Sequence, residues 1–288
     1  MQLGIRLHDM AKLPFEERLK EARAQGFSCI HLALSKISDL PAGNEALTPG
    51  YASWLKRTLD RYGMDVAVLG CYLNLANPDP ERLSSFQKRY TAHLRFASTL
   101  GCDLVGTETG APNLEYKYEP ACHTQEALDT FVEGLRPVVR DAERFGVRIA
   151  IEPVYKHIVW NGKAARYVLD QIASPNLRII FDPVNLLHPD NIDRREKVLS
   201  EAMELLKDEI DVIHLKDYQI LTDPGTGEKK MKAVACGLGE MDYSSVIDFA
   251  VRYKPYIHAT MENTLPENAV AAREFIEGLE KKALEALN

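Results

Sequence analysis

Short apolar runs alternate with longer amphipathic segments along the whole chain. Between the apolar runs, residues repeat at helical spacing, and these segments begin at signals such as Thr48-Pro49 and end at glycines such as Gly101 and Gly146. The apolar runs are rich in β-branched and aliphatic residues, which favour strands. Eight strands are predicted, at Leu3–Leu7, Ser28–Leu34, Asp65–Cys71, Asp103–Thr107, Val147–Ile151, Arg178–Phe181, Val212–Leu215 and Ile257–Met261.

This regular alternation predicts a parallel sheet. The 288 residues divided by eight give 36 residues per unit, which is room for a strand, a helix and two short loops. A closed (β/α)₈ barrel typically has about 250 residues. An open sheet that binds a dinucleotide would carry G-x-G-x-x-G after its first strand, and no such motif follows Leu7. We therefore predict an α/β fold, a single eight-stranded parallel TIM barrel over residues 1–288.

The composition agrees with a folded chain and narrows its partners. Apolar residues make up 45% and charged residues 27%, which excludes disorder for most of the chain. The net charge of −7 counts against binding to nucleic acid or to an anionic membrane. The five cysteines form no C-x-x-C pair and indicate a reducing compartment. Because no leader or membrane segment is recognisable, we expect a cytoplasmic protein that acts on a small molecule. Whether it forms a homo-oligomer stays an open question.

A metal-capable side chain stands at the end of each of the last four predicted strands. These residues are Glu152, Asp182, His214 and Glu262. In a barrel the carboxyl ends of the strands meet at one rim, where three carboxylates would repel one another. A divalent cation removes that repulsion, and this donor set suits Mn²⁺, with Zn²⁺, Mg²⁺ or Co²⁺ as alternatives. Each of these residues alone is also typical of a helix cap or an ion pair, so the prediction of a metal site depends on all four occurring together.

The same residues lie in ordered motifs, which are IEP at 151–153, FDPVN at 181–185, IHLKD at 213–217, GLGEMDY at 237–243 and MEN at 261–263. From the fifth strand to its end, the chain resembles the xylose isomerase-like TIM barrels. That superfamily holds D-tagatose 3-epimerase-type ketose epimerases, hydroxypyruvate isomerase, inosose dehydratase and the apurinic endonucleases. The resemblance implies that Glu152, Asp182, His214 and Glu262 bind one metal ion and that Glu152 and Glu262 are the catalytic acid and base.

The reaction implied by the resemblance is proton transfer at the carbon next to a carbonyl, through an enediolate whose charge the metal spreads. Return of the proton from the opposite face gives epimerisation, and return to the adjacent carbon gives aldose–ketose isomerisation. We therefore expect a metal-dependent sugar isomerase or epimerase. Two alternatives stay open, an inosose dehydratase-like lyase with the same metal site and a non-catalytic sugar-binding barrel.

Three positions differ from the pattern of the tagatose-epimerase-like sequences. There a histidine commonly follows the metal aspartate by three residues, a glutamate follows the first glutamate by six, and an arginine follows the metal histidine by six. Here those positions hold Asn185, Ile158 and Ile220. Because these positions contact substrate hydroxyls in that group, the resemblance does not extend to tagatose or psicose as substrate. Asn185 also argues against the nuclease branch, which needs further histidines.

Further substrate-binding candidates lie at strand ends or in the loops after strands five and six. Lys216 is two residues beyond His214, so on a strand both side chains point to the same side; the alternative for Lys216 is an ion pair with Asp217. For the loop histidines the alternative is a surface role. The complete candidate set is Lys216, Asn185, His8, Tyr72, Glu108, His157 and His188.

Two segments near the seventh strand are open to more than one interpretation. Residues 218–236 form an unusually long connection rich in turn residues, which predicts a hairpin or a lid over the barrel mouth. The GLGE sequence at 237–240 could present backbone N–H groups to a substrate phosphate. A tight turn followed by Asp242 as a helix cap explains the same sequence, so phosphorylation of the substrate stays open.

Overall fold

Eight parallel strands form a closed barrel in the computed structural model, which describes residues 1–287. Asn288, the last residue of the predicted domain, lies outside the described residues. The strands follow the order β1-β10-β7-β6-β5-β4-β3-β2 around the barrel, which confirms the predicted fold. Their bounds are β1 Gln2–Arg6, β2 Cys29–Leu32, β3 Asp65–Gly70, β4 Leu104–Glu108, β5 Arg148–Glu152, β6 Leu177–Phe181, β7 Ile210–Leu215 and β10 His258–Met261.

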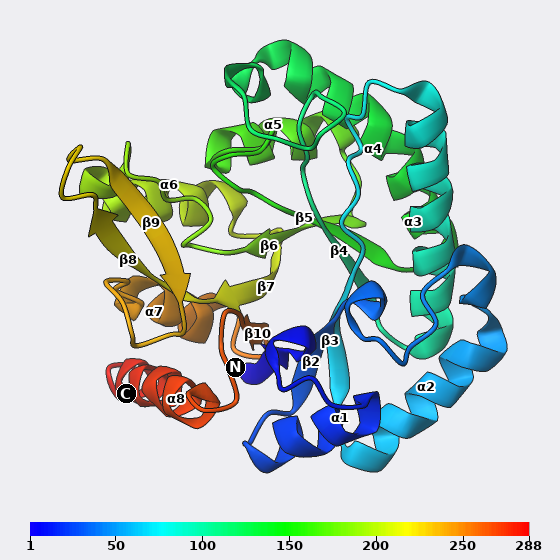
Figure 1. The fold of residues 1–288 in the computed structure, drawn as a ribbon, viewed down its shortest axis with the longest axis horizontal. Helices are drawn as coiled ribbons and strands as arrows, with labels where there is room; N and C mark the ends of the chain where they lie inside the picture. Colours follow the sequence, from blue (N-terminus) through cyan, green and yellow to red (C-terminus); the bar gives the residue numbers. More distant parts are fainter. Residues whose placement is uncertain (288) are drawn as a thin grey trace.

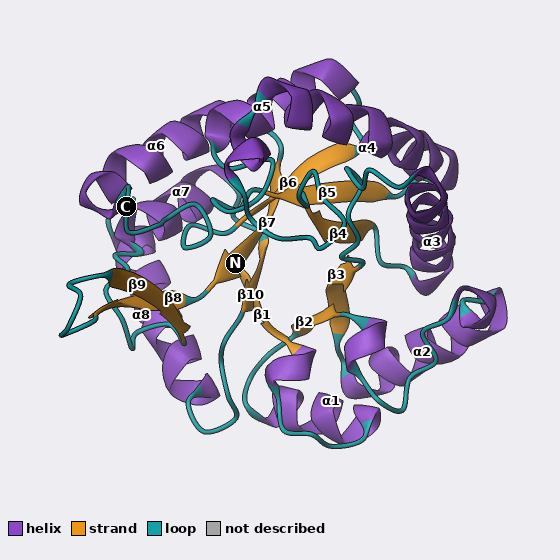
Figure 2. Cartoon of the chain, turned by 45° about the horizontal axis from the view of Figure 1, so that its top comes forward, coloured by secondary structure: helices purple, strands orange, loops and turns teal. Residues whose placement is uncertain are grey.

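Helices surround the barrel strands as an outer ring (Figure 2). The sequence signals at their ends operate as expected: Thr48 Oγ1 accepts a hydrogen bond from Tyr51 N, and Gly101 adopts a left-handed φ of 85° after α3. No helix within residues 1–287 has the length and apolarity needed to cross a membrane. The helices are α1 Phe15–Ala24, α2 Pro49–Tyr62, α3 Pro80–Leu100, α4 Gln125–Phe145, α5 Gly162–Ile172, α6 Arg195–Leu206, α7 Ser244–Tyr253 and α8 Ala269–Glu285.

The second strand is shorter than the sequence predicts. β2 ends at Leu32 instead of Leu34, because the chain turns into a short 3₁₀ helix at Leu34–Lys36. Its register against β3 also shifts between Ile30 and His31. Apolar residues continue through this turn, so the pattern of apolar and polar residues does not show where the strand ends.

A two-stranded hairpin extends the connection between β7 and α7. β8 (Asp217–Thr222) pairs antiparallel with β9 (Lys229–Val234). Asp223 closes the turn, since its Oδ1 accepts hydrogen bonds from the backbone N–H groups of Gly225 and Thr226. Figures 1 and 2 show the hairpin outside the barrel strands, on the side that carries α7. The long connection predicted as a hairpin or lid is therefore a hairpin.

The core has two parts. The larger cluster packs the outer faces of the strands against the helices, while a smaller one draws residues from six strands. Gly106 on β4 borders this smaller cluster, because a Cβ there would lie 2.5 Å from Val68 and 2.8 Å from Ile180. The smaller cluster consists of Cys29, Ala67, Val68, Leu104, Ala150, Ile180 and Val212. With the barrel filled in this way, the polar side chains gather at the carboxyl ends of its strands.

Candidate active site

A cavity of about 180 Å³ lies at the carboxyl ends of the barrel strands. Eight of the residues selected from the sequence border it, whereas His188 lines a neighbouring cavity. Asp182 and His214 are almost completely buried and contact the charged side chains of the wall. The lining residues are Arg6, His8, His31, Tyr72, Glu108, Glu152, Val154, His157, Asn185, Lys216 and Glu262.

His214 lies at the centre of a group of potential metal ligands. Its Nδ1 atom is 3.3 Å from Oε2 of Glu152 and 3.3 Å from Oε1 of Glu262. Donor atoms of Glu152, Asp182 and His214 lie within 4.8 Å of one another, and His31, His214 and Glu262 form a second group of that kind. The structure therefore gathers the three predicted carboxylate ligands around the imidazole of the fourth, His214, and adds His31 as a further candidate.

One buried nitrogen at the centre of this group lacks a hydrogen bond. His214 Nε2 has no polar partner among the described residues, whereas Nδ1 and Asp182 Oδ2 have ion-pair contacts. Buried polar atoms in folded proteins are rarely left in that state. Three carboxylates and an imidazole are also a donor set that hard and borderline divalent cations favour. By both criteria the residues fit a bound divalent cation, which Glu152, Asp182 and His214 would hold together with Glu262.

Two cationic side chains approach the same carboxylates. Lys216 Nζ lies 2.7 Å from Oδ2 of Asp182 and 3.1 Å from Oε2 of Glu262, so Lys216 pairs with these residues and not with Asp217. Arg6 Nη1 lies 2.9 Å from the same Glu262 oxygen. Three carboxylates (Glu152, Asp182, Glu262) thus face two permanent cations. Arg6 is also shared with Asp9, whose Oδ2 lies 2.8 Å from Nε of the arginine, so the carboxylates outnumber the cations.

Burial and charge act on these groups in opposite directions. Burial would raise the pKa of Glu262, but Lys216, His214 and Arg6 lower it well below its ordinary value. For Asp182 burial prevails over Lys216, and the pKa is raised. Burial alone would lower the pKa of His214, yet Glu262 and Glu152 raise it to about 9. Without a bound cation, the imidazole is thus stabilised as a positive charge between carboxylates.

The opposite wall consists of polar side chains whose charged forms burial disfavours. Burial raises the pKa of Glu108, whose Oε2 accepts a hydrogen bond from Tyr116 Oη at 3.2 Å. Burial lowers the pKa of His157, 3.9 Å from the same oxygen, to about 4. Tyr72 Oη lies 2.6 Å from Nε2 of His31. This wall offers hydrogen-bond donors and acceptors of the kind that recognise sugar hydroxyls.

The FDPVN motif orients two of the site residues. Asp182 Oδ1 accepts hydrogen bonds from the backbone N–H groups of Val184 and Asn185, at 2.9 and 3.0 Å. This turn directs the other carboxylate oxygen toward Lys216. Asn185 in turn donates from Nδ2 to Oε1 of Glu152 at 2.5 Å. A short sequence after β6 therefore fixes one predicted ligand and positions a second.

The GLGE sequence forms a turn around the chain's own carboxylate. Gly237 and Gly239 donate their backbone N–H groups to Oδ2 of Asp217, at 3.1 and 3.0 Å, and Met241 donates to Oδ1 at 2.8 Å. Tyr243, not Asp242, is the N-cap residue of α7, although Asp242 Oδ1 accepts a hydrogen bond from the N–H of Ser244, the first residue of the helix. These N–H groups thus serve Asp217, which favours the tight-turn interpretation over a phosphate site.

Three residues near the site were not selected from the sequence. Arg6 and His31 are polar residues near the ends of apolar strands β1 and β2, so the criterion applied to the last four strands identifies them as well. Tyr116 lies in the loop after β4 with a φ of 56°. Nothing in the sequence pattern connects this loop tyrosine with Glu108.

The chain is similar to known proteins over nearly its whole length. A family model described as xylose isomerase-like TIM barrel matches residues 19–279. No sequence among the curated proteins matches the chain. Among solved structures, the chain is similar to the IOLI protein with a bound zinc atom (TM-score 0.74, 16% identity, 98% of this chain and 99% of that one).

Two other solved structures are similar to a comparable degree. One is 3-keto-D-glucoside 4-epimerase, YcjR, from E. coli (TM-score 0.73, 14% identity, 96% of this chain and 99% of that one). The other is the probable 3-DHS dehydratase AsbF from Bacillus anthracis (TM-score 0.72, 14% identity, 97% of this chain and 98% of that one). Similarity at this level of identity shows the common fold.

Proposed function

Because the chain belongs to the xylose isomerase-like TIM barrel family, we propose that it is a divalent-metal-dependent sugar isomerase or epimerase. The observation that carries this proposal is the position of Glu152 and Glu262. Glu152 ends β5 and Glu262 directly follows β10. These strands are separated in the barrel by β6 and β7, yet both side chains reach within 3.3 Å of His214 Nδ1. Two carboxylates thus approach one centre from different sides of the cavity.

In the proposed reaction the two glutamates move the proton. One carboxylate removes a proton from the carbon next to a carbonyl, and the other returns a proton from its own side or to the adjacent carbon. A divalent cation held by Glu152, Asp182, His214 and Glu262 would polarise the carbonyl as a Lewis acid. Asn185, which donates to Oε1 of Glu152 at 2.5 Å, fixes the direction of that carboxylate.

The remaining wall residues bind and orient the substrate. Arg6 and Lys216 lie beside Glu262, where they would stabilise negative charge that develops on substrate oxygens as the proton leaves. Glu108, Tyr72 and His157 border the other side of the cavity and supply donors and acceptors for hydroxyl groups.

The test is exchange of the substrate's α-hydrogen with solvent. Manganese-loaded protein is incubated in D₂O with a panel of aldoses, ketoses and their phosphates, and deuterium incorporation is followed by NMR. We expect incorporation next to the carbonyl, and a loss of at least about 100-fold in Glu152→Gln and in Glu262→Gln, because each removes an acid–base group. Glu267→Gln, at an exposed position, is the matched control with wild-type exchange. No incorporation with any sugar of the panel would contradict the proposal.

Loss of water is the second candidate reaction. After Glu262 has taken the α-proton, its carboxyl group can give that proton to a leaving hydroxyl, and Lys216 Nζ, 3.1 Å from Oε2, would stabilise negative charge on that oxygen. One structurally similar protein is described as a probable dehydratase. Mass spectrometry of the product separates the two reactions, because isomerisation and epimerisation conserve the mass and dehydration removes one water molecule.

A further inference from the structure

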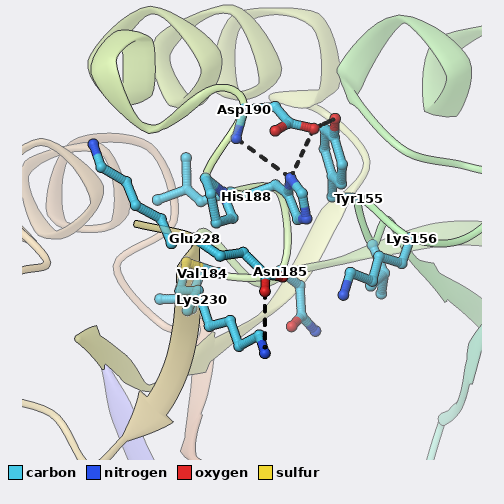
Figure 3. Close-up of a pocket in the computed structure, with 13 residues that line it drawn as sticks. Tyr155, Lys156, Val184, Asn185, His188, Asp190, Glu228 and Lys230 are labelled. Atoms are coloured by element: carbon cyan, nitrogen blue, oxygen red, sulfur yellow. Dashed lines mark hydrogen bonds and ion pairs between the residues drawn. The ribbon is translucent and has the colours of Figure 1, made fainter. Parts of the chain in front are cut away.

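A second, larger cavity adjoins the catalytic one. Its volume is about 740 Å³, and Val154 and Asn185 border both cavities. The loops after β5 and β6 form one side of it and strand β9 of the hairpin forms the other (Figure 3). Ligand pockets for drug-sized molecules typically measure about 300–1,000 Å³. The catalytic cavity is below this range and suits a single small sugar, whereas the outer cavity is within it.

An ordered pair of rings forms one wall of the outer cavity. Tyr155 and His188 stack with centroids 4.4 Å apart and planes 5° apart. Asp190 holds both rings, because its Oδ2 accepts a hydrogen bond from Tyr155 Oη at 3.2 Å and lies 3.1 Å from His188 Nδ1 (Figure 3). The rings are therefore fixed in place without a ligand. The stacking covers one face of each ring, and the polar edges and the outer face of such a pair suit a ring that carries hydroxyl groups.

The charged groups of the outer cavity are mixed in sign. Lys156, Lys229 and Lys230 line it together with Asp190 and Glu228. Lys230 Nζ lies 3.4 Å from Glu228 Oε2, so one of these lysines already has an anionic partner. Phosphate sites concentrate cationic donors, whereas hydroxyl groups both donate and accept hydrogen bonds. The mixture favours a neutral polyhydroxylated group over a phosphate.

We propose that the outer cavity is a second sugar subsite, so that the substrate is a keto-sugar carrying a second, neutral sugar ring. This inference rests on the proposed function, because it assumes that the reacting keto-sugar lies in the catalytic cavity. The glycosidic bond would pass between Val154 and Asn185, where the two cavities meet. The attached ring would then lie between the Tyr155–His188 pair and strand β9.

The test compares a free ketose with disaccharides that contain it. The probes are D-fructose, lactulose and isomaltulose, in which a hexose is joined to fructose at O4 and O6, and fructose 6-phosphate as the anionic alternative. KM is measured by α-hydrogen exchange and Kd by calorimetry. We expect at least one disaccharide to have both constants about tenfold below those of fructose, equivalent to one or two additional hydrogen bonds. Fructose 6-phosphate is expected to show no such gain.

A matched pair of variants on strand β9 localises the effect. Met231 lines the outer cavity, whereas Lys232, its neighbour in the strand, is exposed and does not. Met231→Trp fills the cavity and should abolish the preference for the disaccharide, while Lys232→Trp adds the same bulk elsewhere and should retain it. His188→Ala removes one ring and is the second variant, with a loss of preference in the same direction.

The outcomes separate this inference from the proposed function. Three results would each overturn the subsite. The first is exchange of all sugars with equal KM, and the second is an equal Kd for fructose and both disaccharides. The third is a preference for the disaccharide that survives Met231→Trp and His188→Ala. A gain for fructose 6-phosphate that Met231→Trp removes would show an anion site instead. If no sugar exchanges, the proposed function fails. The calorimetric comparison then decides the subsite, because it does not require turnover.

Discussion

Lys216 is the residue whose removal tests the charge balance of the site most sharply. Its ammonium lies 2.7 Å from Asp182 and 3.1 Å from Glu262, and the residue is only 6% exposed. Lys216→Met keeps the length and the apolar part of the side chain but leaves two buried carboxylates without their shared partner. Breaking a buried ion pair in this way typically costs about 3–5 kcal/mol. We expect the free energy of unfolding of the metal-free variant to fall by up to this amount. The loss is smaller if Asp182 takes up a proton, because the uncompensated charge then disappears.

A divalent cation should reverse most of this loss. With Lys216 gone, a cation at the carboxylates supplies the missing positive charge and no longer competes with the ammonium, so the variant should bind Mn²⁺ more tightly than the wild type. At a Mn²⁺ concentration of 100 times the variant's Kd, binding adds about 2.7 kcal/mol to the stability of the variant, and the wild type gains less at the same concentration because it binds the ion more weakly. The free energy of unfolding is measured by urea denaturation of both proteins, in EDTA and in Mn²⁺.

The control for this experiment is an exposed lysine in an ion pair. Lys56 lies 3.8 Å from Asp60 and is about half exposed, so Lys56→Met should change the stability by less than about 1 kcal/mol. Equal stability of Lys216→Met and wild type in EDTA would refute the role of the ammonium. A variant that is destabilised to the same extent in EDTA and in Mn²⁺, without a gain in affinity, would refute the cation.

Two further predictions concern parts of the chain outside the cavity. Asp217→Ala leaves the N–H groups of Gly237, Gly239 and Met241 without their acceptor and should lower the free energy of unfolding, measured by urea denaturation, by about 3 kcal/mol or more. Asp217→Asn keeps one acceptor oxygen and should cost about half as much. Equal losses in the two variants would contradict this account of the turn. Burial lowers the pKa of His93 from 6.5 to about 4, so the unfolded chain takes up a proton before the folded protein does as the pH falls. Between pH 7 and pH 5 the free energy of unfolding of the wild type should therefore fall by about 2 kcal/mol more than that of His93→Gln. Equal decreases in the two proteins would show that His93 is not buried in its neutral form.

The barrel could be predicted because its signals are local. Each strand is an apolar run of a few residues, and each helix carries its own start and stop residues, such as Thr48 before α2 and Gly101 after α3. The positions of Glu152, Asp182, His214 and Glu262 follow from the same reasoning, since a residue at the end of a parallel strand must lie at the rim. Their roles as ligands, acid and base remain predictions.

The partners of the polar residues could not be predicted, because they depend on contacts between strands. Lys216 has Asp217 as its neighbour in the chain, yet it pairs with Asp182 after β6 and Glu262 after β10. Asp217 instead accepts hydrogen bonds from the turn that follows the hairpin. The outer cavity was missed for a similar reason, since it forms only where β9 folds back over the loops after β5 and β6.

The central claim is that a metal ion and two glutamates move a proton at the carbon next to a sugar carbonyl. Its most direct test is α-hydrogen exchange on one preparation of the wild-type protein, first loaded with Mn²⁺, then treated with EDTA and finally reloaded. We predict that deuterium incorporation into the sugar occurs in the first state, falls to background in the second and recovers in the third. Recovery is expected because EDTA removes the metal ion but not the ligand side chains around His214. Exchange that persists undiminished after the metal is removed, with the removal verified by elemental analysis, would contradict the account.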